Sequence, residues 1–475
     1  MIPVKAVNVS LCSFCAKFSC VRERAILSRG VSSLQPTVSQ PAIPFVADDG
    51  GSAAPGRSGS PTRYRVLVVA SHPVQYTSPL FRRMAQDPRF DLHVAYCSLR
   101  GAEPGIDPEF GATVQWDVPL LDGYCWTHVP NRGSGAESFW GLRNPGLRQL
   151  IANGRFDAVL CYVGYVRASF WIAYRAARAS GAAFLFGTDA NSLEPRDGRR
   201  WKVTPKKYLW PRLFRLADQV IVPSTATREL MLSLGILDDR ITLTPFVVDN
   251  DWWKEQAARA DRDATRASWG VPADAFVVLS CAKLQPWKRP VDLLRAFAAA
   301  GVPRSYLAFA GEGPERARLE REANSLDILP RVRFLGFVNQ TRLPSTYAAA
   351  DVTVLPSEYE PFGVAVNESM CCGCPVIASN SVGAAKDLIS PVTPDFVFPT
   401  QDVTALARIL HRTISKPESL RAAGRAAREH MRAWTPERNV SATWEAVETA
   451  VLRRRGNIEI VARAASEAQG IRTEH

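Results

Sequence analysis

The sequence has no uncharged apolar run long enough to cross a bilayer, which takes about 20 residues in a helix. The best candidate, residues 156–187, is interrupted by Arg167, Arg175 and Arg178. We therefore expect a soluble protein without a membrane-spanning helix.

Cysteine is too sparse for a disulfide scaffold, with 10 residues in a chain of 475. Cys97, Cys161 and Cys281 lie within apolar, strand-like runs, where a reduced thiol packs as a small hydrophobic group. A reducing, cytoplasmic compartment is the simplest interpretation.

Metal ligands are scarce near the N-terminus. Cys12, Cys15 and Cys20 have no fourth ligand nearby, and the first histidine is His72. Because a structural zinc ion takes four protein ligands, we do not expect a zinc site in this segment.

Acidic residues are in deficit: 58 Lys and Arg stand against 46 Asp and Glu, a net charge of +12. An excess of positive charge suits nucleic acid, an anionic membrane surface or a phosphorylated ligand. Only the positions of these charges along the chain can separate the three kinds of partner.

Composition and hydrophobic pattern divide the chain into four segments. Residues 1–62 show no core pattern, and residues 51–61 are Gly, Ser, Ala or Pro at every position except Arg57, which is typical of a linker or a disordered segment. We expect domains at 63–252 and 253–436, followed by a C-terminal helix and polar tail at 437–475.

Each expected domain alternates buried strands with helices. In the first, strands are predicted at 65–70, 92–96, 158–162, 183–186 and 219–222, with a helix at 168–180. In the second, a helix-like stretch at 254–269 precedes strands at 276–281, 306–310, 332–335, 352–355, 376–378 and 396–398, with helices at 291–300, 315–325, 343–350, 364–372, 384–389 and 404–414 between and after them. This alternation predicts an α/β fold of two Rossmann-like, doubly wound parallel sheets. Ligands bind such sheets at the carboxyl ends of the strands, so the two domains are expected to face each other across a cleft.

The densest group of candidate site residues follows the strand at 352–355. Glu360 lies in the loop, Gly363 stands at the helix start, and Glu368 is on that helix. The free amides of a helix N-terminus attract an anion, and a carboxylate suits a vicinal diol such as a ribose. Two glutamates alone would equally fit a solvated loop and a polar helix face.

Two lysines favour the first interpretation. Lys283 and Lys288 share the loop between the strand at 276–281 and the helix at 291–300. Their ammonium groups could hold a diphosphate and stabilise it as it departs with negative charge. The alternative is that both are exposed loop lysines.

The next two strand-end loops are weaker signals. Gly311 and Gly313 lack the third glycine of a dinucleotide-binding motif, so on their own they favour a plain turn. The loop at 336–339 could offer backbone groups to a base.

In this order and spacing, the motifs resemble the nucleotide-sugar half of retaining GT-B glycosyltransferases, most closely the glycosyltransferase group 1, or family 4, class. The matching segments are Lys283-Leu284 with Lys288, 311–314 (GEGP), 336–338 (GFV), 350–352 (ADV), 360–363 (EPFG) with Glu368, and 373–376 (GCPV). They lie within residues 276–407, and the pair of glutamates with its Phe-Gly is the specific element.

The resemblance implies a role for each matching residue. Glu360 would face the donor sugar, and Glu368 would bind the ribose hydroxyls. Lys283 and Lys288 would hold the diphosphate; the family usually has Arg at the first of these positions, and Lys keeps the charge but loses the bidentate fork. With Glu360, these lysines form the expected catalytic set. The other expected donor-binding residues are Phe362, Gly363, Val364, Gly311, Gly313 and Val338.

The first expected domain resembles the acceptor side of the same enzymes. His72 and Gln75 occupy its first loop in place of the family's paired glycines, and residues 186–189 (FGTD) stand where many members have a histidine. We identify Asp189, His72 and Gln75 as candidate acceptor or sugar contacts. Alternatively, Asp189 caps the following segment and His72 packs in a tight turn.

A basic stretch at 196–215 carries eight Lys and Arg against one acid, interleaved with aromatic residues. Such a stretch suits an anionic bilayer surface or a lipid-phosphate acceptor. The alternative is a solvated helix whose Leu209, Leu213 and Leu216 pack on the sheet. Nucleic acid is not expected as a partner, because no recognition fold accompanies the charge.

The sequence thus predicts an enzyme that moves a sugar from a nucleotide-diphosphate-sugar donor to a hydroxyl acceptor, which would be a carbohydrate, a lipid-linked molecule or a small molecule. Retention of anomeric configuration, and a role in polysaccharide or glycolipid synthesis, are implied by the resemblance alone. No cofactor and no metal are expected, because the Asp-x-Asp pairs at 249–251 and 261–263 lie in the connection between the domains. The alternatives are a nucleotide-sugar epimerase on the same fold and a non-catalytic sugar-nucleotide-binding scaffold.

Overall fold

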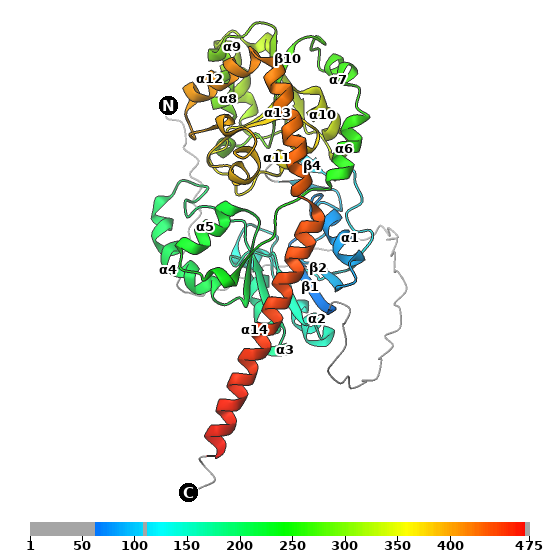
Figure 1. Cartoon of the computed structure of the whole chain (residues 1–475), viewed down its shortest axis with the longest axis vertical. Coiled ribbons are helices and arrows are strands. Elements are labelled where there is room, and N and C mark those ends of the chain that lie inside the picture. The colour runs from blue at the N-terminus through cyan, green and yellow to red at the C-terminus, as the bar shows by residue number, and fades with distance from the viewer. Residues whose placement is uncertain (1–61, 108–111, 471–475) are drawn as a thin grey trace, which may run out of the picture. The chain divides into compact units, whose positions relative to one another are not determined.

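A computed structural model of the chain describes residues 62–107 and 112–470 (Figure 1). The predicted linker, apart from Thr62, and the three N-terminal cysteines lie outside the described residues. The described chain is built on two separate parallel sheets, as the hydrophobic pattern predicted. The domain boundaries at 62, 252 and 436 stay predictions.

The first sheet has seven parallel strands in the order β5-β2-β1-β6-β7-β8-β9. Their bounds are β1 Tyr64–Ala70, β2 Phe90–Tyr96, β5 Cys125–His128, β6 Ala158–Cys161, β7 Ala183–Gly187, β8 Gln219–Val222 and β9 Ile241–Leu243. The five predicted strands are confirmed. The sequence analysis missed the two edge strands β5 and β9 and the separate antiparallel pair β3 (Gly105–Asp107) and β4 (Ala112–Val114).

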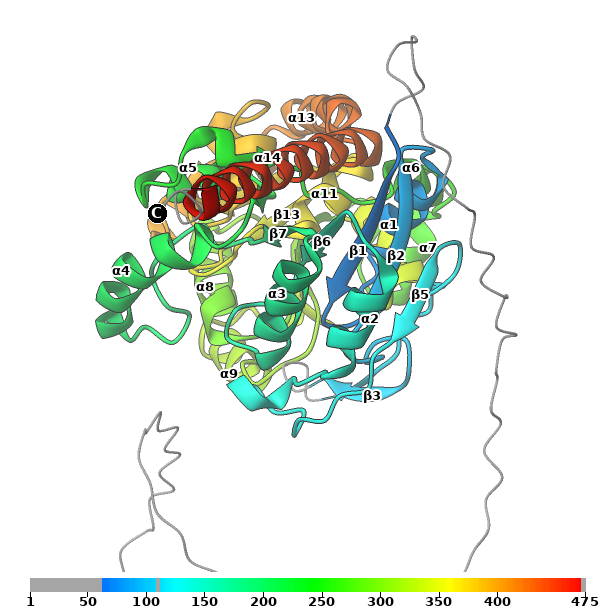
Figure 2. The ribbon, with the colours of Figure 1, turned by 90° about the horizontal axis from the view of Figure 1, so that it is seen from below.

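Helices cover both faces of the first sheet. One face packs against α2 (Gly146–Gly154), α3 (Ala168–Ser180), α4 (Val203–Phe214) and α5 (Thr225–Ser233). The other face packs against α1 (Ser78–Gln86) and α14 (Pro436–Gly470). Figure 2 shows α3 and α14 on opposite sides of β1, β6 and β7.

The C-terminal helix α14 returns to the first sheet. It is longer than the predicted helical stretch at 437–453. Its side chains Val440, Val447 and Val451 recur at helical spacing and are buried in the same core cluster as Val66 and Val68 of β1. The helix that follows the second sheet in the sequence therefore completes the core of the first.

The second sheet has six parallel strands in the order β12-β11-β10-β13-β14-β15. Their bounds are β10 Phe276–Cys281, β11 Ser305–Ala310, β12 Val332–Gly336, β13 Val352–Leu355, β14 Val376–Ser379 and β15 Val397–Phe398. Each lies within one residue of its prediction. Helices α8 (Pro290–Ala300), α9 (Arg316–Ser325) and α12 (Val403–Ile414) cover one face, and α6 (Asn250–Ala258), α10 (Leu343–Ala349), α11 (Val364–Cys371) and α13 (Pro417–His430) cover the other.

The helix-like stretch predicted at 254–269 is two helices, α6 and α7 (Arg262–Ser268). Asp249 caps α6 by accepting a hydrogen bond from the Trp252 amide (3.3 Å), and Asp261 caps α7 through the Ala264 amide (2.9 Å). A capping acid followed by another acid in the first turn is the usual complement to the helix dipole. The two Asp-x-Asp pairs are therefore helix starts.

The basic helix α4 is only partly embedded. Leu213 is 8% exposed and packs on the sheet, but Leu209 is 62% exposed. The interpretation that Leu209, Leu213 and Leu216 pack on the sheet is wrong for Leu209, whereas Leu216 packs against the same core cluster as Leu213. Leu209 lies on the part of the helix face that the sheet does not cover. Across the described residues, no helix is long and apolar enough to cross a membrane.

A buried arginine joins α7 to the second sheet. Arg266 is 2% exposed, forms an ion pair with Asp351 (2.8 Å), and donates to the carbonyl oxygens of Ala349, Ala273 and Ala275 at 2.7 to 2.8 Å. We predict that Arg266→Met lowers the free energy of unfolding by about 3 kcal/mol, because it leaves three carbonyls unpaired and removes the more buried of the two arginines that pair with Asp351, the other being Arg262.

Denaturant titration of the full chain measures this loss. The matched control is Arg421→Met, which removes the exposed pair of Arg421 (66% exposed) with Glu418 and should change stability by less than about 0.5 kcal/mol. Equal losses in the two variants would contradict the assigned role of Arg266.

Candidate functional site

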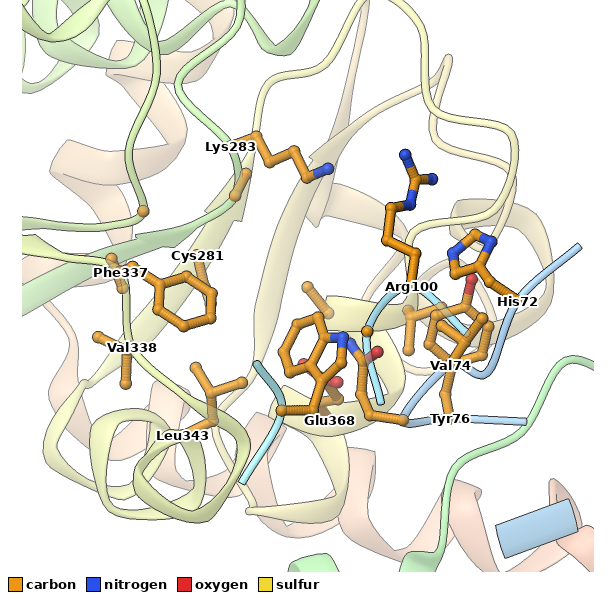
Figure 3. Close-up of a pocket in the computed structure, with 18 of the residues that line it drawn as sticks. His72, Val74, Tyr76, Arg100, Cys281, Lys283, Phe337, Val338, Leu343 and Glu368 are labelled. Carbon is orange, nitrogen blue, oxygen red and sulfur yellow. The ribbon is translucent and has the colours of Figure 1, made fainter. Parts of the chain in front are cut away.

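A cavity of about 450 Å³ lies between the strand-end loops of the two sheets (Figure 3). The first sheet contributes His72 and Gln75 from the loop after β1, together with Tyr76 and Arg100. The second contributes Lys283, Gly311, Val338, Val364 and Glu368. The structure therefore brings together seven of the predicted site residues from both halves.

Parallel strand direction explains this convergence. Lys283 follows β10, Gly311 follows β11, Val338 follows β12, and α11 with Glu368 follows β13. All four strands are neighbours in one parallel sheet, so their carboxyl ends share an edge. In Figure 3 the Lys283 side chain extends toward Arg100 and His72, which come from the other half of the chain.

Gly311 and Gly313 hold two of these loops in close contact. Their φ angles are +151° and +153°. A Cβ at Gly311 would lie 2.0 Å from the Ala282 carbonyl oxygen, and one at Gly313 would lie 2.5 Å from that of Leu284. The Leu284 amide also donates to the Glu312 carbonyl (2.8 Å). The glycines therefore position the loop that carries Lys283, and only Gly311 lines the cavity.

Gly363 is the N-cap of α11 and has a left-handed backbone conformation (φ +98°). Glycine adopts this conformation without the steric cost that a side chain would bring. Phe362 is 3% exposed and stacks on Phe246, with ring centroids 4.9 Å apart. This contact holds the ring of Phe362 in the core. The part of Phe362 in donor binding stays a prediction.

Glu368 is a buried carboxylate in the wall of the cavity. It is 6% exposed, and the Tyr347 hydroxyl donates to its Oε2 at 2.9 Å. Burial raises the pKa of Glu368 to about 7, although the hydrogen bond from Tyr347 opposes the shift. Near neutral pH this group therefore exchanges between an acceptor-only carboxylate and a neutral acid.

Lys288 and Glu360 form an ion pair with side chains 19% and 12% exposed, and neither residue is among those that line the cavity. The Ser357 hydroxyl donates to the same carboxylate at 3.4 Å. The Asn191 amide group donates to the Glu360 carbonyl oxygen at 3.1 Å, which links the loop after β7 to the loop after β13. The pair holds an ammonium group near the start of α11.

A second cavity, of about 270 Å³, lies at the carboxyl ends of the first-sheet strands. It shares His72, Val74 and Tyr76 with the first cavity and also contains Asp189. The next helical element after Asp189 starts at Arg200, so Asp189 does not cap a helix. Burial raises the pKa of Asp189, and the charge of Glu360 adds to this shift, although a hydrogen bond from the backbone of Asp189 itself opposes it.

Two further predicted contacts lie in the first loop. The Ser71 hydroxyl is 2.9 Å from Nδ1 of His72. The side-chain oxygen of Gln75 is buried and has no hydrogen-bond partner within the described chain, so it offers an open acceptor to a ligand hydroxyl.

Sequence reasoning missed several residues of the site. Tyr347, which holds Glu368, lies on α10 and carries no local motif. Tyr76 and Arg100 line the first cavity from the other half of the chain. Of these three residues, only Tyr76 could have been suspected from the sequence, because it adjoins the predicted contact Gln75.

Comparison with known proteins identifies the family. The description "Glycosyl transferases group 1" matches residues 261–430, and "Glycosyl transferase 4-like domain" matches residues 99–246. The D-inositol 3-phosphate glycosyltransferase of Saccharomonospora viridis is 32% identical, with 82% of this chain and 95% of the relative covered. The chain belongs to the group 1 glycosyltransferases. It has the GT-B fold of the family, so the predicted family and fold are confirmed. Retention of anomeric configuration stays a prediction.

Other relatives share the family over shorter or more divergent stretches. The 2-deoxystreptamine glucosyltransferase of Streptomyces kanamyceticus is 30% identical, with 46% of this chain and 56% of the relative covered. The solved structure of HepE from Anabaena, in complex with UDP and glucose, superposes with a TM-score of 0.61 at 18% identity, with 84% of this chain and 100% of that chain covered. The structural likeness extends the agreement in fold to nearly the whole described chain.

The raised pKa of Glu368 predicts a pH-dependent stability. Between its ordinary pKa of 4.5 and about 7, the folded protein binds more protons than the unfolded chain, so stability falls as the pH rises through this window. We expect Glu368→Gln to abolish this fall. The free energy of unfolding of the variant, relative to that of the wild type, should therefore rise by about 3 kcal/mol between about pH 5 and about pH 8.

Denaturant titrations at the two pH values measure the difference. The control is Glu358→Gln, a 47%-exposed acid in the neighbouring loop, which should follow the wild type at both. A stability difference between Glu368→Gln and wild type that does not change with pH would contradict the burial argument.

Proposed function

We propose that this glycosyltransferase takes its sugar from a nucleotide-diphosphate sugar, keeps the anomeric configuration and needs no metal. The observation that carries the proposal is the cavity that Lys283, Glu368 and Val338 line, together with the Lys288–Glu360 ion pair in the loops after β10 and β13. Two ammonium groups and a helix N-terminus provide the positive potential that a departing diphosphate requires. The acceptor hydroxyl would belong to a carbohydrate, a lipid-linked molecule or a small molecule.

The proposed reaction balances without an added co-reactant. The bond between the anomeric carbon and the diphosphate oxygen breaks, and its electron pair leaves with the diphosphate. The acceptor oxygen bonds to the anomeric carbon on the same face, and its proton passes to the departing phosphate oxygen. Lys283 and Lys288 stabilise the negative charge, while Glu360 holds Lys288 in place.

The cavity walls suit the rest of such a donor. Glu368 and Val338 both line the cavity. In this proposal Glu368 accepts hydrogen bonds from the ribose hydroxyls, and the loop after β12 that carries Val338 meets the base. The Anabaena protein HepE was solved with UDP and glucose and with UDP-glucose. A uridine nucleotide sugar is therefore the first donor to test.

We predict that one of UDP-, GDP- and ADP-glucose raises the melting temperature of the wild type, since a ligand that binds only the folded state stabilises it by mass action, by about 2.7 kcal/mol at a hundredfold excess over Kd. Glu368→Ala should lose most of the shift, because the ribose loses its acceptor. A thermal-shift panel measures both effects, with Glu358→Ala as the matched surface control.

Turnover of the stabilising donor, followed as release of the nucleoside diphosphate in the presence of candidate acceptors, separates a transferase from a binding scaffold. Absence of a shift with all three donors at millimolar concentration would contradict the proposed donor site. A shift that Glu368→Ala retains in full would show that the ribose is bound elsewhere.

We further propose that the basic stretch 196–215 contacts an anionic membrane surface, which would hold a cytoplasmic enzyme at the inner face of the membrane. Trp201, Tyr208 and Leu209 are 62% to 66% exposed, and Lys207 and the arginines beside them are exposed as well. Aromatic and aliphatic side chains among basic groups are the usual composition of an interfacial segment.

The expected result is that the protein sediments with vesicles containing anionic lipid and not with vesicles of neutral lipid. Trp201→Ser combined with Leu209→Ser should weaken this binding by about tenfold, because the apolar anchors are removed. Leu237→Ser, at another 66%-exposed leucine, should bind as the wild type does. Equal binding to neutral and anionic vesicles would contradict the proposal.

A further inference from the structure

Two connections cross between the two halves of the chain, and hydrogen bonds join them to each other. Residues 244–249 lead from β9 to α6, and residues 431–435 lead from α13 to α14. The Asn250 side-chain amide donates to the carbonyl oxygens of Met431 (2.9 Å) and Trp434 (3.0 Å). The two connections therefore form one structural unit, which we call the crossing.

Phe246, in the first of these connections, also reaches the helix that carries Glu368. Its carbonyl oxygen accepts a hydrogen bond from the indole nitrogen of Trp434 (2.6 Å), in the second connection. The same oxygen accepts another from the side-chain amide of Asn367 (2.8 Å), on α11. One oxygen atom thus ties the crossing to α11 at the residue that precedes Glu368.

The ring of Phe246 makes a second contact with the same helix, at its start. It stacks on the ring of Phe362, with centroids 4.9 Å apart and planes inclined by 20°. Tyr76, in the loop after β1, is a further aromatic neighbour, with its centroid 5.1 Å away and its plane inclined by 55°. Because Phe362 directly precedes Gly363, the N-cap of α11, the stacked pair fixes the start of α11 to the crossing.

The helix α11 is consequently held from two sides. Toward its C-terminal end, the Ser369 hydroxyl donates to the carbonyl oxygen of Cys374 (2.9 Å), which fixes that end to the turn before β14. Its start and Asn367 are held by Phe246. Glu368 lies between these contacts in the sequence and lines the first cavity. The position of its carboxylate in the cavity therefore depends on Phe246 as well as on contacts within the second half.

Asn367 is buried at a cost that packing alone does not explain. Its side chain is 0% exposed, and its oxygen atom has no hydrogen-bond partner within the described chain. A buried polar group with an unmade hydrogen bond destabilises a fold, whereas an apolar side chain of similar size would fill the space without this cost. What the amide supplies in return is the hydrogen bond to the Phe246 carbonyl oxygen.

We propose that Phe246 is a positioning residue of the donor site, which holds Glu368 in the direction that the ribose of the donor requires. It acts through α11, because Phe246, Phe362 and Asn367 are not among the residues that line the first cavity. The proposal rests on the proposed function, since it takes the first cavity as the donor site. It also makes the affinity for the donor depend on the geometry of the crossing.

Calorimetric titration of the full chain with the nucleoside diphosphate of the stabilising donor measures this effect. Phe246→Leu keeps an apolar side chain but loses the stacked ring, so we expect its Kd to be about fivefold higher than that of the wild type. Phe246→Tyr keeps the ring and should bind within about twofold of the wild type. No acceptor is added, because Phe246 also lines the second cavity and could act there directly.

The matched control is Phe214→Leu, which also removes a stacked ring. Phe214 is 2% exposed and stacks on Phe186, with centroids 5.4 Å apart and planes inclined by 24°. It lines neither cavity. Loss of its ring should weaken the fold and leave the Kd for the nucleoside diphosphate unchanged.

A double-mutant cycle with Glu368→Ala separates the positioning of Glu368 from a general loss of packing. Without the carboxylate there is nothing to misplace, so Phe246→Leu should change the Kd by less than about twofold in this background. An effect of Phe246→Leu that is equally large with and without Glu368 would overturn the proposal. So would a Phe246→Tyr variant that binds as weakly as Phe246→Leu.

A second variant tests the same attachment if Phe246→Leu does not fold. Asn367→Leu removes the hydrogen bond to the Phe246 carbonyl oxygen and leaves the stacked rings in place. It should raise the Kd by about threefold when Glu368 is present, and by much less in the Glu368→Ala background. An unchanged Kd in Asn367→Leu would contradict the proposed role of this hydrogen bond.

Failure of this proposal is distinguishable from failure of the proposed function. A wild type that binds no nucleoside diphosphate would count against the donor site itself. A wild type that binds, with a Phe246→Leu variant that binds equally well, would leave the donor site in place and overturn only the role of Phe246.

Discussion

The parallel direction of both sheets is the constraint on which the rest of the structure depends. It places the carboxyl ends of β10, β11, β12 and β13 on one edge, so loops that are far apart in the sequence meet at one cavity. Lys283 and Glu368 are 85 residues apart in the chain and line the same wall. No local interaction between them is needed, because strand order alone brings them together.

Close backbone packing and a buried carboxylate determine the shape and the electrostatics of the site. Gly311 and Gly313 allow two strand-end loops to approach more closely than any side chain would permit. The Tyr347 hydroxyl holds Glu368 in the cavity wall by a hydrogen bond. Burial there disfavours the charged carboxylate, and the pKa of Glu368 is raised as a result. A carboxylate kept in such surroundings without a permanent counter-charge is typical of a ligand site, because a purely structural role would be filled more cheaply by a neutral side chain.

The strands of the second sheet were predictable almost to the residue, whereas in the first sheet five strands were predicted and the two edge strands β5 and β9 were not. Strands buried on both faces, such as 276–281 and 352–355, read as continuous apolar runs. The edge strand β5, with the sequence Cys-Trp-Thr-His, has no such run. The break between α6 and α7 depends on the single cap Asp261, which a polar helical pattern does not reveal.

The sequence by itself determined the fold class, the family and seven of the residues that line the first cavity, because buried strands and strand-end motifs are local patterns. Only the tertiary structure decided that Glu368 is buried against Tyr347, that Leu209 faces outward while Leu213 packs inward, and that Asp189 and His72 line one cavity. Burial and electrostatic environment are sums over residues that are distant in sequence. No local pattern along the chain contains them.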